Sequence, residues 1–274
     1  MRKTGLSPFI LACMVFGFTF LYAPIIMLII FSFNASRLVT VWAGFSTKWY
    51  GELMHDEQIL GAAYLSFQIA TINAFLSVII GTMAAFALVR FGRFYGRSLM
   101  IQSISSRLVL PDVILGLSIL LLFVSLQGLI GWPERRGMMT IIIAHVTFSS
   151  AYVAIVVQSR LAGLDRSFEE AAFDLGAGPF TVFRTVTLPM IAPSLIAGWL
   201  LAFILSFDDL VIASFASGPS ATTLPMVIFS KVRLGINPEV NALATIIVVA
   251  VAIGVVLAGS LLQRQAATRG DGKP

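Results

Sequence analysis

The sequence predicts an all-α, polytopic membrane protein with six transmembrane helices in a single domain over residues 1–274. Two observations support this fold class. The chain is 58% hydrophobic and 11% charged, with a mean hydropathy of +0.95, and a soluble domain of this size cannot bury so much apolar surface. Its charged residues also fall in short loops between long apolar runs, as membrane topology requires.

Six apolar runs are each long enough to cross about 30 Å of hydrocarbon, which takes roughly 20 helical residues. They cover residues 8–33, 64–89, 99–130, 138–159, 190–213 and 240–262. The first run follows a basic N-terminus, but it is far longer than the apolar part of a signal peptide, so we expect an uncleaved span. Six spans place both termini on one side.

Lysine and arginine are unevenly divided between the two sides, and this sets the orientation. The side with the termini carries twelve: Arg2, Lys3, Arg90, Arg93, Arg97, Arg107, Arg160, Arg166, Arg184, Arg264, Arg269 and Lys273. The opposite side carries six: Arg37, Lys48, Arg135, Arg136, Lys231 and Arg233. We therefore expect both termini in the cytoplasm. The net charge of +5 reflects this topology and predicts no nucleic-acid partner.

Two long loops are expected outside. Loop 34–63 holds Trp42, Trp49 and Tyr50, which predict either an interfacial helix anchored by aromatic side chains or a docking surface for an external partner. Loop 214–239 contains an amphipathic stretch, residues 224–234, that is too short to span and suits a helix at the outer surface. The polar tail, residues 264–274, is expected to be disordered.

The third span has an uncertain start, because Leu108 to Ile130 would suffice alone but Leu99 to Ile104 is also largely apolar. If it begins near Leu99, then Arg107, Pro111 and Asp112 lie inside the membrane. A helical proline frees one carbonyl, which lipid tolerates only where protein or a water-filled cavity satisfies it. Arg107 would then reach toward the cytoplasmic face.

Polar residues also mark the fourth and fifth spans. His145, Ser149 and Tyr152 recur at i, i+4 and i+7 and share one helix face, which fits either ordinary helix packing or a pathway lining. Asp208 and Asp209 end the fifth span, and an acid at the centre of a span costs about 3 kcal/mol on insertion scales. They are expected either to pair with Arg107 or to line a wet cavity. Two readings stay open: a functional cation site, or a helix end that is solvated at the outer mouth.

The segment 165–193 is polar yet has the pattern of a structured finger. Ser167 and Glu170 form a capping box, so we expect a helix to begin at Ser167. Gly176 and Gly178 are expected to end it.

A second short helix is expected to begin at Pro179 and to end at Leu188-Pro189. The two helices share an apolar side made by Phe168, Phe173, Leu175, Phe180, Val182 and Phe183. A finger with such a side suits docking into a partner better than it suits chemistry.

Motifs for chemistry are absent from the sequence. There is no G-x-x-x-x-G-K-[ST] loop for ATP, no H-E-x-x-H and no G-x-S-x-G. Cys13 is the only cysteine, and His55 and His145 are the only histidines and are far apart, so we expect no metal site. We therefore expect no catalysis and no bound cofactor. What remains is a receptor-like scaffold or transport, the latter by a subunit of a complex or by a carrier or channel acting alone.

The finger resembles the EAA loop of permease subunits of binding-protein-dependent ABC importers. The match is Glu170-Ala171-Ala172, three residues, Gly176, nine residues, and then Val186-Thr187-Leu188-Pro189. The resemblance implies a type I importer permease fold, in which residues 165–189 form a coupling helix that docks on a cytoplasmic ATPase. Glu170, Ala171, Ala172, Gly176, Leu188 and Pro189 would then make the coupling surface.

Further stretches narrow the resemblance to the second permease subunit of polyamine importers, of the putrescine-permease type. They are FTFLYAPIIMLIIFSFN, VTVWAGFSTKWYGEL, LVRFGRF, LPDVILGLSILLLF, SFDDLVIASFASGP, TTLPM and NPEVNALATI. The implied partners are a second homologous permease, two copies of an ABC ATPase that binds ATP and Mg, and a periplasmic polyamine-binding protein. The implied location is the bacterial inner membrane.

A polyamine needs acidic groups for its ammonium ends and aromatic or aliphatic walls for its methylene stem. The acids inside the expected spans are Asp112, Asp208 and Asp209, and we expect them in the substrate pathway. Tyr152, Phe207 and His145 are expected as weaker contributors to its walls. Related permeases carry sulfate, molybdate or ferric iron. An anion pathway should avoid adjacent acids.

Overall fold

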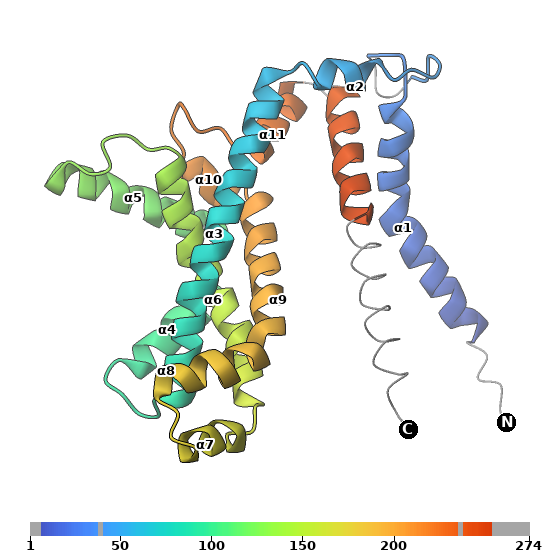
Figure 1. Ribbon diagram of the computed structural model, residues 1–274. Coiled ribbons are helices and arrows are strands. Elements are labelled where there is room, and N and C mark those ends of the chain that lie inside the picture. The colour runs from blue at the N-terminus through green and yellow to red at the C-terminus, as the bar shows by residue number, and fades with distance from the viewer. Residues whose placement is uncertain (1–6, 38–40, 235–237, 254–274) are drawn as a thin grey trace. The chain divides into compact units, whose positions relative to one another are not determined.

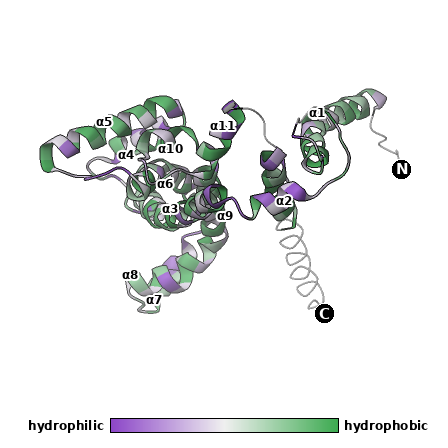
Figure 2. Ribbon diagram, turned by 90° about the horizontal axis from the view of Figure 1, so that it is seen from above, coloured by the Kyte–Doolittle hydropathy of each residue, from purple (hydrophilic) through white to green (hydrophobic). Residues whose placement is uncertain are grey.

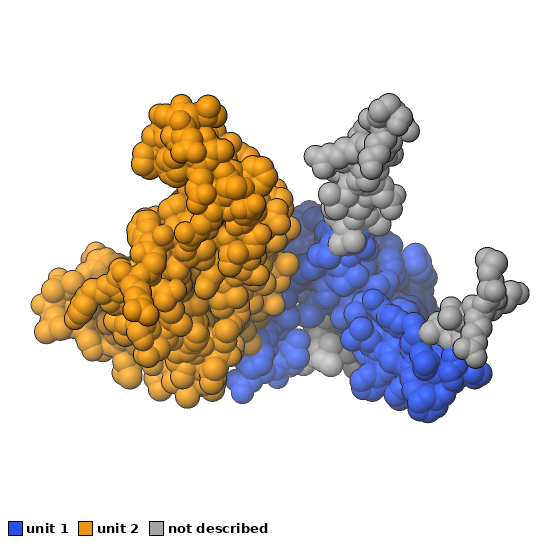
Figure 3. Space-filling view, turned by 90° about the horizontal axis from the view of Figure 1, so that it is seen from below, with its two compact units in different colours: residues 1–60, 228–274 blue, residues 61–227 orange. Residues whose placement is uncertain are grey.

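The computed structural model describes residues 7–37, 41–234 and 238–253, in which helices are joined by turns and loops and the β-structure is one isolated bridge between Asn34 and Phe45 (Figure 1). The predicted all-α class is confirmed for this part of the chain. The described residues form two compact units (Figure 3). One unit takes residues 1–60 with 228–274, and the other takes residues 61–227.

Five helical runs are long and apolar enough to span a membrane. They are α1 (Pro8–Ser32), α3 (Glu57–Arg90), α5 (Asp112–Ile130), α6 (Met138–Ala162) and the run Pro179–Phe207, which ends in α9 (Leu188–Phe207). Figure 2 shows the hydrophobic colour along α1 and α5. The sixth predicted span, 240–262, begins in a helix, Pro238–Ile253, and the rest of it and the tail 264–274 lie outside the described residues.

The third span is not continuous, so the predicted run 99–130 is wrong. A separate helix, α4 (Arg97–Arg107), ends before the break, and α5 begins at Asp112. Pro111 lies just before α5 with an extended backbone (φ −61°, ψ 142°). A proline is favourable at a helix start and unfavourable inside one, because it has no N–H to donate.

The fifth span is interrupted as well, so the predicted run 190–213 is wrong. α9 ends at Phe207, and a short helix, α10 (Val211–Ala216), follows. The carboxylate of Asp209 accepts hydrogen bonds from the N–H groups of Ile212 (3.4 Å) and Ala213 (2.6 Å). An aspartate that caps backbone N–H groups starts a new helix and thereby ends the previous one.

The core of residues 61–227 is built on α3, α6 and α9, with α6 and α9 packed along their lengths. Val153 of α6 lies between two glycines. A Cβ at Gly81 of α3 would come within 2.8 Å of the Val153 Cβ, and one at Gly198 of α9 within 3.2 Å of its Cγ1. Asn73 of α3 donates to the carbonyl of Ala202 (2.9 Å), so a buried polar group also joins the outer two helices.

The turn after α10 closes over the start of α6. Thr140 donates to the carbonyl of Ala216 (2.7 Å), and Arg136 donates to that of Phe215 (3.0 Å). Gly218 lies so close that a Cβ there would overlap the carbonyl oxygen of Arg136. Only a residue without a side chain fits.

We expect Gly218→Ala to lower the thermal unfolding midpoint of the purified protein, because overpacking against fixed backbone costs about 1–3 kcal/mol or more. Gly128→Ala is the matched control. A Cβ at Gly128, inside α5, meets nothing within 4 Å, and alanine is the better helix former. An equal midpoint for Gly218→Ala and the wild-type protein would contradict this close packing.

In the other unit, the helix predicted over residues 224–234 is confirmed as α11 (Leu224–Leu234), and it carries a charge cluster. The ammonium of Lys231 lies 2.6 Å from Asp56 and 3.0 Å from Glu239.

α2 (Lys48–Leu53) lies in loop 34–63. Trp49 of α2 is 1% exposed and donates to the carbonyl of Asn34 (2.6 Å), so it is a core residue and not a surface anchor.

The charge cluster predicts a pH dependence. Burial raises the pKa of Asp56, but hydrogen bonds from Lys231 and the Ile59 N–H outweigh it and hold that pKa below 3.8. Burial lowers the pKa of Lys231, but Asp56 and Glu239 outweigh it and hold it above 10.5. The stability from Asp56 is therefore lost as pH falls below about 4, and that from Lys231 is lost as pH rises above about 10.5.

We expect Lys231→Met to lower the thermal midpoint between these limits and to lower it less at pH 3 than at pH 7. Lys48→Met is the control, since the described residues give Lys48 no carboxylate partner. A midpoint difference that is the same at pH 3 and pH 7 would show that the charges of this cluster are not what stabilises it.

Candidate substrate path and coupling finger

The two helix breaks place all three predicted pathway acids at helix ends. Asp112 is the first residue of α5, Asp208 directly follows α9, and Asp209 precedes α10. α5 and α10 are packed together, with Gly116 of α5 against the ring of Phe215. Backbone breaks inside a membrane occur where protein or water satisfies the freed groups, so these two breaks form a candidate polar region.

Asp209 belongs to a closed buried network. His145, which is 0% exposed, lies 3.2 Å from the Asp209 carboxylate through Nε2 and 2.6 Å from Ser206 Oγ through Nδ1. A neutral imidazole that donates from Nε2 to Asp209 and accepts at Nδ1 from Ser206 satisfies all three side chains. Because this carboxylate also caps α10, its oxygens are already engaged by the protein.

Asp112 is paired as well. Its carboxylate lies 2.9 Å from the guanidinium of Arg107, the last residue of α4. That guanidinium lies over the ring of Phe148 (4.6 Å to the centroid) and near that of Tyr152 (5.8 Å). The position of Arg107 is therefore fixed by a carboxylate and two aromatic faces.

The two helix breaks are connected through α6. The rings of His145 and Phe148 meet edge to face with centroids 5.4 Å apart, so Phe148 separates Arg107 from the histidine network. Sequence reasoning missed Phe148, although its place three residues after His145 on the same helix could have shown it. Ser149, predicted on this face, accepts a hydrogen bond from Asn73 and serves helix packing.

Asp208 differs from the other two acids. It is exposed, and among the described residues its side chain has no ion pair or hydrogen bond to another side chain. Its neighbour Phe207 stacks on Phe203 (5.7 Å), which stacks on Trp199 (5.4 Å). A free carboxylate at the end of a row of aromatic rings suits a cation with an apolar stem.

The first helix of the finger begins where expected, but its start has a different cause. α7 (Ser167–Asp174) begins at the predicted residue, yet no side-chain cap is made by Ser167. Asp165 accepts a hydrogen bond from the Ser167 N–H (3.0 Å) instead. The predicted capping box is therefore wrong, because an aspartate two residues earlier already engages that N–H.

The C-terminal end of α7 forms a Schellman motif. The N–H of Gly176 bonds to the carbonyl of Phe173 (2.8 Å) and that of Ala177 to the carbonyl of Ala172 (3.1 Å). Gly176 has φ +83°, which a glycine adopts at little cost. A short helix, α8 (Pro179–Val182), follows.

The predicted end of the second helix at Leu188-Pro189 is wrong. A π turn, Phe183–Thr187, carries α8 directly into α9. Pro189 therefore lies in the first turn of α9, where its missing N–H is tolerated.

Glu169 fixes the finger to the core. It accepts from Arg90 of α3 (3.1 Å) and from Thr187 (2.8 Å), while Arg166 donates to the carbonyl of Val89 (3.0 Å). Glu170, the acid of the predicted coupling surface, is exposed and faces none of these partners. The sequence pattern did not show that Glu169 anchors the finger whereas Glu170 is exposed.

The finger also presents apolar side chains to the outside. Among them Phe168 is 57%, Phe173 46%, Leu175 90% and Phe180 75% exposed. Ala171 and Gly176 are exposed as well, and Ala172 is half-buried. So many uncovered apolar side chains on a well-anchored element are typical of an interaction site.

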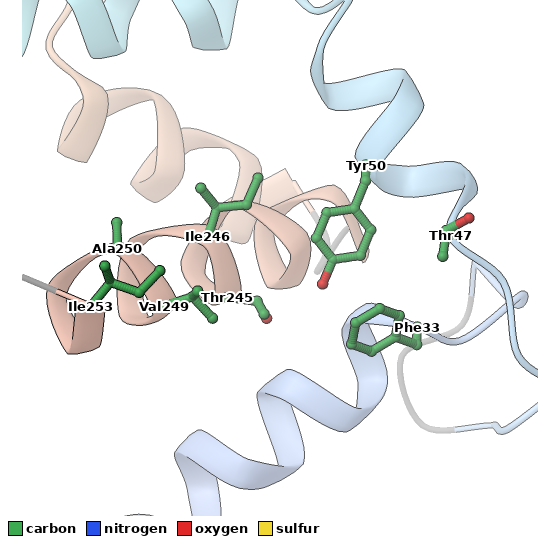
Figure 4. Close-up of a pocket in the computed structure, with 8 residues that line it drawn as sticks. All are labelled: Phe33, Thr47, Tyr50, Thr245, Ile246, Val249, Ala250 and Ile253. Atoms are coloured by element: carbon green, nitrogen blue, oxygen red, sulfur yellow. The ribbon is translucent and has the colours of Figure 1, made fainter. Parts of the chain in front are cut away.

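An apolar pocket in the unit with residues 1–60 is a poor candidate for a cation path. It has a volume of about 520 Å³ and lies among Phe33, Thr47, Tyr50, Thr245, Ile246, Val249, Ala250 and Ile253 (Figure 4). None of these side chains is an acid. Its chemistry suits hydrocarbon, so the helix breaks remain the candidate path.

The chain is similar to a known protein family and to known proteins. A family model described as "Binding-protein-dependent transport system inner membrane component" matches residues 77–269. The chain is 60% identical to the Putrescine transport system permease protein PotI of Escherichia coli (strain K12), over 94% of this chain and 92% of that one. It is 42% identical to the Spermidine/putrescine transport system permease protein PotC of the same strain, over 90% of each chain.

Two solved structures share the fold. A bacterial ABC transporter involved in the import of the acidic polysaccharide alginate has a TM-score of 0.70 at 20% identity, covering 93% of this chain and 95% of that one. The MetNI methionine ABC transporter, in an inward-facing conformation, has a TM-score of 0.59 at 17% identity, covering 76% and 95%. At such identities the likeness describes the fold alone.

Proposed function

Because this chain belongs to the family of binding-protein-dependent transport system inner membrane components, we propose that it is a permease subunit of an ATP-driven importer of polyamines, putrescine or spermidine. The single observation that carries the substrate class is the 60% identity to a putrescine permease over 94% of the chain. The curated relatives named above are transport permeases and not enzymes.

The candidate path supports a cationic substrate. Among the described residues, Asp208 offers a carboxylate with no partner on another side chain and directly follows the stacked Phe207 in the sequence, and Asp112 pairs with Arg107, which lies over Phe148 and near Tyr152. Carboxylates and aromatic faces bind ammonium groups, while methylene stems pack on the rings. An anion such as sulfate or molybdate would be repelled by both acids.

The partners follow from what the sequence lacks and what the finger presents. The chain has no P-loop, so ATP and Mg are bound by two copies of a separate ATPase in the cytoplasm. The exposed side of α7, with Glu170 and Gly176, docks on that ATPase. A second homologous permease completes the path, and a periplasmic polyamine-binding protein delivers the substrate. Both termini and the finger face the cytoplasm.

Reconstitution with omissions tests this assignment against a carrier or channel that works alone. Proteoliposomes holding this chain, its partner permease and the ATPase should take up radiolabelled putrescine or spermidine only with binding protein outside and ATP inside. Leaving out any one component should abolish uptake. Full uptake by this chain alone, or uptake driven by a proton gradient without ATP, would contradict the proposal.

A further inference from the structure

The guanidinium of Arg107 lies among a carboxylate and aromatic rings, the kinds of side chain that bind organic ammonium ions. Its Nη2 lies 2.9 Å from Asp112 Oδ1, and its guanidinium carbon lies 4.6 Å from the Phe148 ring centroid and 5.8 Å from that of Tyr152. A carboxylate with two aromatic faces is a common arrangement for alkylammonium ligands. In this structure the protein's own cation fills it.

Burial within this group is uneven. The side chain of Arg107 is 10% exposed and Phe148 is 4% exposed, whereas the side chain of Asp112 is 54% exposed. Arg107 Nε is buried and has no hydrogen-bond partner in the described part of the chain, which lowers the gain from holding the guanidinium there. The carboxylate can therefore be reached by a second cation, and the resident one is incompletely satisfied.

The two charged residues also lie on different helices. Arg107 ends α4 and Asp112 begins α5, with residues 108–111 between them. Arg107 can leave Asp112 by a change of its own rotamers, without unfolding either helix. Phe148 also contacts the ring of His145, which contacts Asp209, so Arg107 is linked through Phe148 to the second helix break.

We propose that Arg107 is a built-in competitor of the substrate. Its guanidinium occupies an ammonium subsite formed by Asp112, Phe148 and Tyr152, and one ammonium end of a transported diamine displaces it. This inference rests on the proposed function, because the displacing ligand is the polyamine. While no substrate is present, the arginine neutralises the charge of Asp112.

Direct binding tests the inference. We would measure equilibrium binding of radiolabelled putrescine to the purified permease–ATPase complex in lipid nanodiscs, without binding protein. Removing the competitor by Arg107→Gln should tighten binding roughly fivefold, the factor that corresponds to a partly exposed ion pair. Arg107→Gln combined with Asp112→Asn should lose this gain, because the subsite carboxylate is gone.

Arg97→Gln is the matched control. Arg97 lies on the same helix and also has a buried Nε without a partner, but its Nη2 bonds to the carbonyl of Leu88 (3.3 Å) and not to a carboxylate. The control should bind putrescine as the wild type does. An assembled Arg107→Gln complex with unchanged or weaker binding would overturn the competitor role.

If Arg107→Gln does not assemble, Arg107→Lys replaces it. Lysine keeps the charge but loses the planar fork and stacks less well, so binding should tighten about twofold, and unchanged binding would again overturn the inference. Uptake with binding protein and ATP tests the proposed function separately. A complex could import no polyamine while its Arg107→Gln form binds putrescine more tightly. That result would contradict the proposed polyamine import and still support the ammonium subsite.

Discussion

Replacing Asp208 by asparagine is expected to lower polyamine uptake by roughly 10- to 100-fold, since one hydrogen bond to a charged group contributes about 1.5–3 kcal/mol. Complex assembly and the thermal unfolding midpoint should stay as in the wild type, because the described structure gives the Asp208 side chain no side-chain partner to lose. Uptake into proteoliposomes and thermal unfolding in detergent measure the two effects.

The adjacent acid should behave differently. Asp209→Asn weakens both the contact with His145 and the cap on α10, so we expect a lower unfolding midpoint as well as lower uptake. Glu134→Gln removes an exposed charge outside the candidate path and should change neither measurement. Normal uptake by Asp208→Asn, Asp209→Asn and Asp112→Asn alike would remove the argument for a cation path at the helix breaks.

Changes on the exposed side of the finger are expected to separate ATP hydrolysis from transport. Glu170→Arg reverses a charge in the docking surface, and Gly176→Trp adds bulk at the end of α7. A truncated or reversed contact in an interface costs about 2 kcal/mol or more, so uptake should fall at least tenfold. Binding protein should no longer stimulate ATP hydrolysis, or the ATPase should no longer copurify.

Matched variants separate docking from local strain. Gly92 also has positive φ (+66°) and open space at its Cβ, so Gly92→Trp imposes a similar backbone cost outside the finger. Glu52→Arg reverses an exposed charge on α2. Both should leave ATPase binding unchanged. Normal uptake and normal ATPase binding by Glu170→Arg and Gly176→Trp would show that the ATPase docks elsewhere.

Much of the fold could be predicted because a long apolar run in a membrane protein usually forms a spanning helix. The spans around α1, α3 and α6 could be located from hydropathy alone. The start of α7 was also located correctly, although the capping box that predicted it is not formed. The third and fifth spans were drawn too long. Hydropathy averages over a window, whereas a single Pro111 or a capping Asp209 decides locally where a helix ends.

The candidate path, too, could be predicted only in part from the sequence. Acids in apolar runs are visible in a sequence, so Asp112, Asp208 and Asp209 could be named. The sequence could not show which of these acids are paired. Arg107 pairs with Asp112 and His145 pairs with Asp209, and no local sequence pattern predicts either pair. Pairing depends on how α4, α5, α6 and α10 meet, which no local pattern records.

The most direct test of the account is ATP-dependent uptake of radiolabelled putrescine and spermidine by the complete complex in proteoliposomes, with binding protein outside and ATP inside. The account predicts uptake of one or both, reduced at least tenfold by Asp208→Asn in a complex that still assembles. An assembled complex that moves neither amine, yet hydrolyses ATP in response to the binding protein of another ligand, would keep the importer assignment and contradict the polyamine substrate.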